Sequence, residues 1–301
     1  MPRVVASSDD GFPDVRRWSD AWKRRGVAGC RLIVAIGLVV AIAGCGTTVE
    51  TPADEATAVA QTRELGLPYK VMLVGDGVMT DADPGIRAAA ESLGPVEVDD
   101  QAYWGFALSK PDWYDWRTEW SQLIDTYDPD AVVALFGVHD TYAHGVGGGP
   151  PDPGGTEWQS WYRLQINAAM DILTDRLATV YWIGMLPVGD PVASERIRAN
   201  NEIVREVVQS RPTGRYLEPD PVFVADGGAA RLFDPVSGFA LRKDDGVHMC
   251  AAGAGILGLA LATAIADDLG TGVGSAFLTG QWRSTDSFLD HAPENCRISA
   301  P

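Results

Sequence analysis

From Lys70 onward the sequence alternates short apolar runs with longer amphipathic runs, and this alternation constrains the fold more than any other feature. The short runs are rich in β-branched residues, as buried parallel strands are. They lie at Lys70–Val74, Val96–Val98, Ala131–Phe136, Val180–Gly184 and, more weakly, Tyr216–Leu217. The longer runs predict helices at Pro84–Leu93, Asp115–Tyr127, Thr156–Leu177, Ser194–Ser210 and Ala251–Leu269. A parallel sheet covered by helices on both faces, a three-layer α/β/α sandwich, is therefore expected.

Residues 67–301 are expected to form one domain, because the pattern shows neither an internal repeat nor a second unit. Pro84 suits the first turn of its helix, where a missing N–H is tolerated. Thr156 and Ser194 are expected to be N-caps of the helices that follow them.

The N-terminal segment is typical of an export signal. Basic residues gather between positions 16 and 31, and the apolar stretch Leu32–Ala43 follows them. A helix that spans a membrane needs about 20 such residues, so this shorter stretch fits the core of a signal peptide. It ends in Ile42-Ala43-Gly44-Cys45, which resembles the bacterial lipobox, in which the cysteine is acylated and becomes the first residue of the mature protein.

We therefore expect a signal peptide at residues 1–44, a lipid on Cys45 and a polar tether at residues 45–66. The chain would be exported and held on the outer face of a bacterial cell membrane through that lipid. The alternatives are an ordinary signal peptide with an incidental Cys45, and a signal anchor.

Export also bears on the cysteines. Cys30 would be lost with the signal peptide, which leaves Cys250 and Cys296 in an oxidising compartment besides the lipidated residue. Pairing of these two is the expected outcome, and two free thiols are the alternative.

The formal net charge of −17 repels phosphate backbones, so a nucleic acid is not expected as a partner.

Three segments follow predicted strands or precede the last helix, where ligands bind in open α/β sheets. They are Val74–Met79, Phe136–Asp140 and Arg242–His248. The spacing of three in the last segment brings an aspartate and a histidine together on one turn. Taken singly, these segments are typical of a tight turn, a structural His-Asp pair and a capped surface turn.

In this order, the segments resemble the motifs of the SGNH (GDSL-like) hydrolase superfamily, in its bacterial cell-envelope branch. The resemblance covers about Lys70 to Asp268 and implies a flavodoxin-like (SGNH hydrolase) sheet. It implies that His248 is the general base and that Asp245 orients its imidazole. The family's Gly-Asp-Ser motif reads Gly-Asp-Gly here, so Gly77 stands at the nucleophile position beside Asp76.

The same resemblance assigns an oxyanion hole. His139 stands where the family has an asparagine that binds the oxyanion, and Asp140 after it is retained. An imidazole N–H could still donate to an oxyanion. Gly105 would be the second oxyanion-hole glycine. The resemblance implies neither a cofactor nor a metal ion.

Because serine is missing from the nucleophile position, two functions are open: a binding protein and an active enzyme. Removing the nucleophile of a serine hydrolase costs about a millionfold in turnover. We therefore expect a pseudoenzyme that binds an envelope glycan, a lipid or a partner protein. The alternative is an active esterase or acyltransferase on cell-envelope glycans or acyl esters, which uses water activated by His248 or a non-standard nucleophile. Thr80 and Ser109 are the nearest hydroxyls in sequence.

Other chemistries stay open at the level of sequence. Asp76, Asp140 and Asp245 would suit a glycosidase-type site if two of them lay at a suitable separation. A metal site from Asp76, His139 and His248 rests on no recognised ligand spacing. Several tryptophans near loops would line a groove or pack in the core: Trp113, Trp116, Trp120, Trp158 and Trp161.

Overall fold

The computed structural model describes residues 68–142, 149–274, 276–284 and 296. Its centre is a sheet of five parallel strands in the order β2-β1-β3-β4-β5. The strands are β1 (Tyr69–Gly75), β2 (Val96–Asp100), β3 (Ala131–Leu135), β4 (Thr179–Ile183) and β5 (Gly214–Leu217). This is the flavodoxin-like order, in which the connections leave β1 and β3 in opposite directions.

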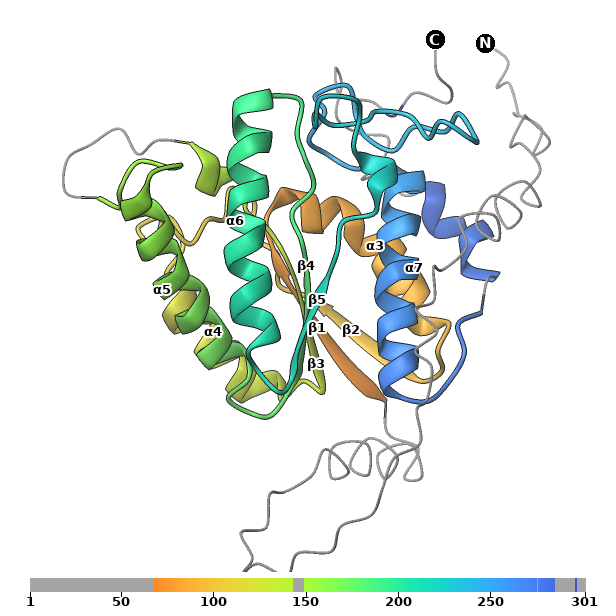
Figure 1. Cartoon of the computed structure of the whole chain (residues 1–301). Helices are drawn as coiled ribbons and strands as arrows, with labels where there is room; N and C mark the ends of the chain where they lie inside the picture. Colours follow the sequence, from red (N-terminus) through yellow and green to blue (C-terminus); the bar gives the residue numbers. More distant parts are fainter. Residues whose placement is uncertain (1–67, 143–148, 275, 285–295, 297–301) are drawn as a thin grey trace, which may run out of the picture.

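Helices cover both faces of the sheet (Figure 1). One face carries α3 (Gly77–Glu91) and α7 (Ala251–Asp268), and the other carries α4 (Trp116–Tyr127), α5 (Thr156–Leu173) and α6 (Pro191–Gln209). Short 3₁₀ helices are η1 (His139–Thr141), η2 (Pro221–Phe223), η3 (Ala276–Thr279) and η4 (Gln281–Ser284). The predicted three-layer α/β/α sandwich is confirmed.

The strands show why their sequences are continuously apolar. In β1, Val71 and Leu73 face the α3–α7 layer, whereas Met72 and Val74 face the layer of α4, α5 and α6. All four side chains have no exposed surface. Because successive side chains point to opposite faces, a strand covered on both sides must be apolar at every position.

Helices α3 and α7 cross at a contact that only glycine permits. A Cβ at Gly258 would lie 2.3 Å from the carbonyl oxygen of Gly85, and a Cβ at Gly85 would lie 2.5 Å from the backbone of Ala254. Helix α7 is long and apolar enough to span a membrane by composition, but most of it is buried against α3 and the sheet, as in a core helix.

The starts of two helices differ from the sequence prediction. Helix α3 begins at Gly77 with Asp76 as its N-cap, so Pro84 lies inside the helix and not in its first turn. Helix α6 begins at Pro191 with Asp190 as its N-cap. Ser194 lies within α6, where its buried hydroxyl accepts from the amide of Val188 (2.9 Å) and donates to the carbonyl of the same residue (2.7 Å). Ser194 is therefore not an N-cap.

Helix α5 differs at both ends. Its N-cap is Gly155, and Thr156 is its first helical residue. The helix ends at Leu173, before the predicted end at Leu177, which has a positive φ of 62°. A branched side chain at positive φ cannot continue a right-handed helix, so the chain has already turned there.

A disulfide joins Cys250, the N-cap residue of α7, to Cys296. The predicted pairing of these two cysteines is therefore confirmed, and it places residue 296 beside the start of α7. The expected signal peptide, Cys45 and the tether lie outside the described residues.

Candidate active site

A cleft of about 450 Å³ opens at the carboxyl ends of β1 and β3, where the strand order reverses. Such a reversal leaves a crevice between two loops that diverge, and ligands of open α/β sheets bind there. The described residues that line it are Asp76, Gly77, Val78, Trp104, Gly105, Val138, His139, Tyr142, Asp245, Val247 and His248. The structure thus brings together residues of all three predicted segments and Gly105.

Asp245 and His248 form a hydrogen-bonded pair on one wall. Nδ1 of His248 lies 2.5 Å from Oδ2 of Asp245. Oδ1 of the same carboxylate accepts from the amides of Val247 (2.8 Å) and His248 (3.0 Å). The carboxylate is thereby fixed by its own turn, and it directs Nε2 of the imidazole away from itself. This is the geometry of a general base with an orienting carboxylate.

The two groups shift each other's pKa in opposite directions. Burial opposes the charged form of both. The hydrogen bond to His248 and the two amides nevertheless lower the pKa of Asp245 to about 2. The hydrogen bond and the negative charge of Asp245 outweigh burial at His248 and raise the pKa of the imidazole above its ordinary value. The pair therefore stabilises a protonated imidazole beside an ionised carboxylate.

Gly77 lies next to His248. A Cβ built at this position would lie 3.3 Å from Nε2 of His248, and 3.0 and 3.1 Å from two ring carbons of Trp104. The indole of Trp104 also stacks on the imidazole of His248, with ring centroids 5.1 Å apart. Trp104 thus covers the space next to Gly77 into which a side chain at this position would extend.

Asp76 has a supporting position at the rim of the cleft. Its Oδ1 accepts from the amide of Val78 (2.9 Å) and caps α3. Its Oδ2 accepts from the amides of Gly137 (3.1 Å) and Val138 (3.4 Å), so the carboxylate connects the ends of β1 and β3. Burial raises the pKa of Asp76 to about 6, against these hydrogen bonds.

His139 and Asp140 share η1 but differ in position. His139 faces the cleft, and burial together with the charges of Lys110 and His248 lowers its pKa. Asp140 is fully buried, and its carboxylate accepts from the amides of Leu108 (3.3 Å) and Ser109 (3.0 Å). Burial raises the pKa of Asp140 to about 6. Asp140 therefore holds the loop after β2 and does not itself face a ligand.

Gly105 lies in that loop and lines the cleft at a φ of 78°. Gly77, the first residue of α3, brings a helix N-terminus to the cleft, and first-turn amides have no acceptor within the helix. Such a terminus favours a negatively charged group. The cleft thus combines the Asp245–His248 pair, a second histidine and a helix N-terminus around one small space.

Two buried cations belong to the predicted segment Arg242–His248, but the sequence assigned them no role. Lys243 forms a buried ion pair with Asp81 of α3 (3.3 Å), and the other carboxylate oxygen of Asp81 accepts from the amide of Met249 (3.0 Å). Arg242 donates to the carbonyls of Val247 and Pro187. These contacts fix the turn against α3. Asp81 follows Gly77 by four residues, one helical turn, which is the signal that could have identified it.

The described residues of this cleft do not form the other sites that the sequence left open, namely another hydroxyl nucleophile, a glycosidase-type carboxylate pair or a metal site. Thr80 and Ser109 do not line the cleft, so neither hydroxyl faces the space between Gly77 and His248. Asp76 and Asp140 are buried on backbone amides and Asp245 binds His248, so a glycosidase-type pair is not formed. The described residues also contain no group of three His, Cys, Asp or Glu side chains that could hold a metal ion.

The tryptophans separate into core and surface. Trp116, Trp120 and Trp158 are buried in the layer of α4, α5 and α6, whereas Trp113 is 61% exposed. Trp104, which contacts both Gly77 and His248, and Tyr142, which also lines the cleft, were not predicted as site residues.

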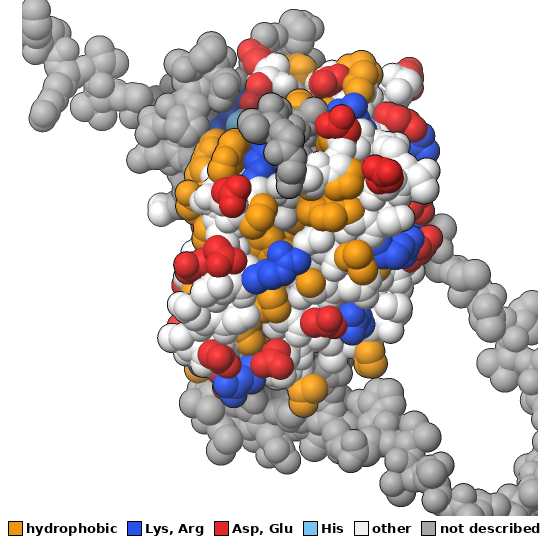
Figure 2. All heavy atoms as spheres, turned by 90° about the vertical axis from the view of Figure 1, so that its left-hand side faces the viewer, with side chains coloured by type: hydrophobic (Ala, Val, Ile, Leu, Met, Phe, Trp, Pro, Cys, Tyr) orange, Lys and Arg blue, Asp and Glu red, His pale blue; other side chains and the backbone are white. Residues whose placement is uncertain are grey.

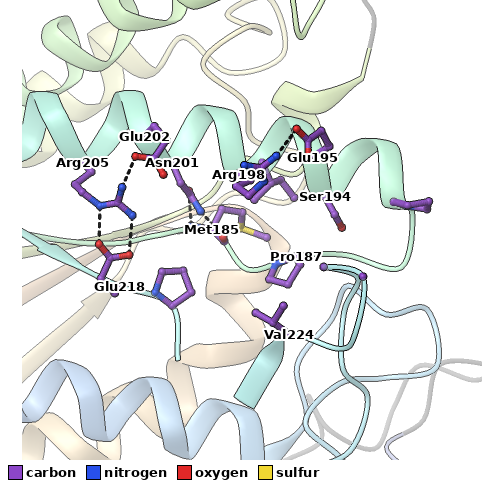
Figure 3. Close-up of a pocket in the computed structure, with 15 residues that line it drawn as sticks. Met185, Pro187, Ser194, Glu195, Arg198, Asn201, Glu202, Arg205, Glu218 and Val224 are labelled. Atoms are coloured by element: carbon purple, nitrogen blue, oxygen red, sulfur yellow. Dashed lines mark hydrogen bonds and ion pairs between the residues drawn. The ribbon is translucent and has the colours of Figure 1, made fainter. Parts of the chain in front are cut away.

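A second cavity of about 450 Å³ lies between α6 and the loop after β5 (Figure 3). Its charged side chains are paired with one another. Arg205 binds Glu218 through two hydrogen bonds and also contacts Glu202, and Arg198 contacts Glu195. This cavity contains no histidine, whereas His139 and His248 both line the first cleft.

Fold and cleft together define the protein as a three-layer α/β/α domain with a histidine–aspartate pair at the topological switch point. The chain belongs to the family described as "Protein of unknown function (DUF459)", whose profile matches residues 70–264. A search of curated proteins finds no match.

A solved structure shares the fold, and two others are similar with TM-scores below 0.5. A candidate acylhydrolase from Bacteroides fragilis has a TM-score of 0.51 at 14% identity, with 73% of this chain and 99% of that chain covered. A carbohydrate esterase of family 3 from Talaromyces cellulolyticus has a TM-score of 0.46 at 17% identity, covering 67% and 98%. The acetylxylan esterase Axe2 from Geobacillus stearothermophilus has a TM-score of 0.44 at 16% identity, covering 69% and 97%.

Proposed function

We propose that this protein is a nucleophile-lacking member of the SGNH (GDSL-like) hydrolase superfamily that binds a ligand in the cleft of a former esterase. The observation that carries the proposal is the position of Gly77. A side chain there would start 3.3 Å from the Nε2 of His248, the placement that a nucleophile needs beside its base. The fold shared with a candidate acylhydrolase agrees with this origin.

Trp104 supports binding over catalysis. Its ring lies within about 3 Å of where a Cβ at Gly77 would be and stacks on His248. A serine in the present arrangement would crowd this ring. The tryptophan therefore borders the place of the nucleophile with a flat apolar surface, which contributes contact area for a ligand but no reactive atom. It would have to shift by only a few tenths of an ångström to admit a Cβ at Gly77.

The retained pair of Asp245 and His248 favours a second candidate function, slow hydrolysis by water. The raised pKa of His248 and its Nε2 next to the cleft would allow it to take a proton from a bound water molecule. In that reaction no acyl-enzyme forms, because the protein supplies no nucleophile. The two functions differ in whether the natural protein turns over an ester.

The test is ester hydrolysis by the purified protein beside its Gly77→Ser and Gly77→Ala variants, on short acyl esters. Gly77→Ala adds the same Cβ crowding without a hydroxyl and is the matched control. We expect turnover from Gly77→Ser alone, with a gain of up to about 10⁶-fold over the natural protein. Adding His248→Ala to Gly77→Ser should remove that gain.

Two other results would contradict the proposed function. If the natural protein hydrolyses the esters and His248→Ala abolishes this activity, water hydrolysis replaces the binding function. If Gly77→Ser is as inactive as Gly77→Ala, the cleft lacks more than its nucleophile, and descent from an esterase with an otherwise complete site is wrong.

We also propose that the protein is lipid-anchored through Cys45 on the outer face of a bacterial membrane. The Cys250–Cys296 disulfide supports export, because disulfides persist in oxidising compartments. Mass spectrometry of the mature N-terminus should find an acylated Cys45. An unmodified terminus at another residue would remove the anchor.

A further inference from the structure

The exposed aromatic side chains of the described residues gather at the mouth of the cleft. They are Tyr103 (44% exposed), Trp104 (50%), Trp113 (61%) and Tyr142 (41%), and we call these four the aromatic rim. Trp104 and Tyr142 both line the cleft, from the loops after β2 and β3, and Trp113 lies next to Gly105, which also lines it. The exposed large aliphatic side chains lie elsewhere: Leu164, Leu177, Val192 and Val236.

The surface view agrees with a local apolar region. On the face that carries α4 and α5, hydrophobic side chains gather in the upper half, towards the carboxyl ends of the strands, among charged side chains of both signs (Figure 2). Contiguous exposed apolar surface on a soluble domain marks a place where something binds.

Neighbouring groups hold the rim in place. Tyr103 stacks on Tyr114, with ring centroids 4.7 Å apart, and its amide donates to the carbonyl of Gly75 (2.9 Å) at the end of β1. The ammonium of Lys110 lies 4.2 Å from the ring centroid of Trp113. Flat surfaces fixed before binding lose little conformational entropy when a ligand arrives.

The charges around the cleft select against anions. Of the described residues that line it, none is a lysine or an arginine, and two are aspartates, Asp76 and Asp245. The nearby Lys110 stacks on Trp113, and the whole chain has a net charge of −17. The N-terminus of α3 and a protonated His248 attract an anion locally, but the two aspartates and the net charge of the chain oppose it. We therefore infer that the occupant is uncharged.

The residues that line the cleft also favour a sugar ring over an acyl chain. An acyl chain needs an aliphatic wall, whereas the aliphatic side chains of this cleft are three valines, Val78, Val138 and Val247. A sugar ring presents flat C–H faces, which pack on aromatic rings, and hydroxyl groups at its edge. His139 and His248 provide ring nitrogens that can bond to such hydroxyls.

We propose that the aromatic rim binds an uncharged oligosaccharide, with one ring in the cleft between Trp104 and Tyr142 and the chain continuing over Trp113. This inference rests on the proposed binding function and names its ligand. The cleft volume of about 450 Å³ lies within the range of small-molecule sites, roughly 300–1,000 Å³.

The test is a titration of the full-length chain, kept in a polyoxyethylene detergent that has no sugar headgroup. The probes are cellotetraose, xylotetraose and chitotetraose, followed by the indole N–H signals in NMR spectra. Tetragalacturonate is the anionic comparison and 1-octanol the acyl-chain comparison. We expect saturable binding of a neutral oligosaccharide that shifts the Trp113 signal, identified from the spectrum of Trp113→Phe.

Variants of the aromatic rim and of a distant surface residue test whether the ligand binds at the rim. Trp113→Ala and Tyr142→Ala should each weaken binding about tenfold or more, as loss of an aromatic contact residue does. Leu164→Ala, a 67% exposed residue of α5 away from the cleft, is the matched control and should leave the affinity unchanged. Trp113 and Tyr142 are exposed, so the variants should fold, which circular dichroism checks.

Three results would overturn the inference. They are no binding of any neutral probe up to about 10 mM, an affinity unchanged in both rim variants, and a shift of Trp113 by octanol or tetragalacturonate instead. Ester turnover is measured separately, so the two proposals fail separately. Sugar binding with turnover contradicts only the binding-protein function, and absence of both contradicts only the sugar ligand.

Discussion

Asp76 offers a stability test of the cleft, because one buried carboxylate caps α3 and connects the ends of β1 and β3. Replacing Asp76 with alanine removes the cap from the amide of Val78, which costs about 1 kcal/mol. It also leaves the buried amide of Gly137 without this acceptor, which costs about 1–3 kcal/mol. At pH 4 we therefore expect Asp76→Ala to lower the free energy of unfolding by about 2–4 kcal/mol.

The same substitution should cost much less at pH 7. Burial raises the folded-state pKa of Asp76 from 3.8 to about 6, so between these values the folded protein binds more protons than the unfolded chain. Stability from this group is therefore present below pH 3.8 and is lost as the pH rises through 6. Two pK units correspond to about 3 kcal/mol. The variant lacks this loss, so its deficit should fall to near zero at pH 7.

The assay is urea unfolding of both proteins at pH 4 and pH 7, followed by tryptophan fluorescence. Asp140 also has a raised pKa of about 6, but it is present in both proteins and to first order drops out of the difference. Asp115→Ala, which removes the exposed N-cap of α4, controls for loss of a cap and should cost about 1 kcal/mol at pH 7. A deficit of Asp76→Ala that is equal or larger at pH 7 would refute the reasoning.

Three further predictions follow from the structure. Gly258→Ala places a Cβ 2.3 Å from a carbonyl of α3 and should lower stability by about 1–3 kcal/mol in denaturant titration, whereas Gly272→Ala, which meets open space, should not. Cys296→Ser opens a disulfide that spans 46 residues, which should cost about 4 kcal/mol and lower Tm; an unchanged Tm would contradict this. Asp245→Asn removes the charge that raises the pKa of His248, so an NMR titration of the imidazole should show a lower pKa. Because a raised histidine pKa stabilises the fold at low pH and loses this effect as pH rises through it, Asp245→Asn should lose most stability where His248 is protonated.

The sheet could be predicted from the sequence because strands buried on both faces must be apolar at every position. Val132 and Val180, for example, lie in runs that can only be such strands or buried helix. The start of α3 could not be predicted in the same way. Its first turn begins at a glycine, and Pro84 marks the interior of the helix although proline is common at a helix start.

Part of the candidate site could also be predicted from the sequence. The order of three motifs along the chain suggested that Gly77, Asp245 and His248 meet, and the cleft brings them together. Trp104 could not be placed, because the loop after β2 has no periodic pattern and its position depends on packing against His248. The ion pair of Asp81 and Lys243 joins residues 162 positions apart, and no local signal reports such a contact.

The start of β1 has a consequence for how the protein would stand on a membrane. In Figure 1 the strand begins at Tyr69 at the lower end of the sheet, whereas the cleft lies at the upper end, where the strands finish. An anchor at Cys45 would therefore join the domain at the pole opposite the cleft. Residues 45–66 can span at most about 75 Å. The opening of the cleft would then lie on the side of the domain away from the tether, so the tether would not obstruct it.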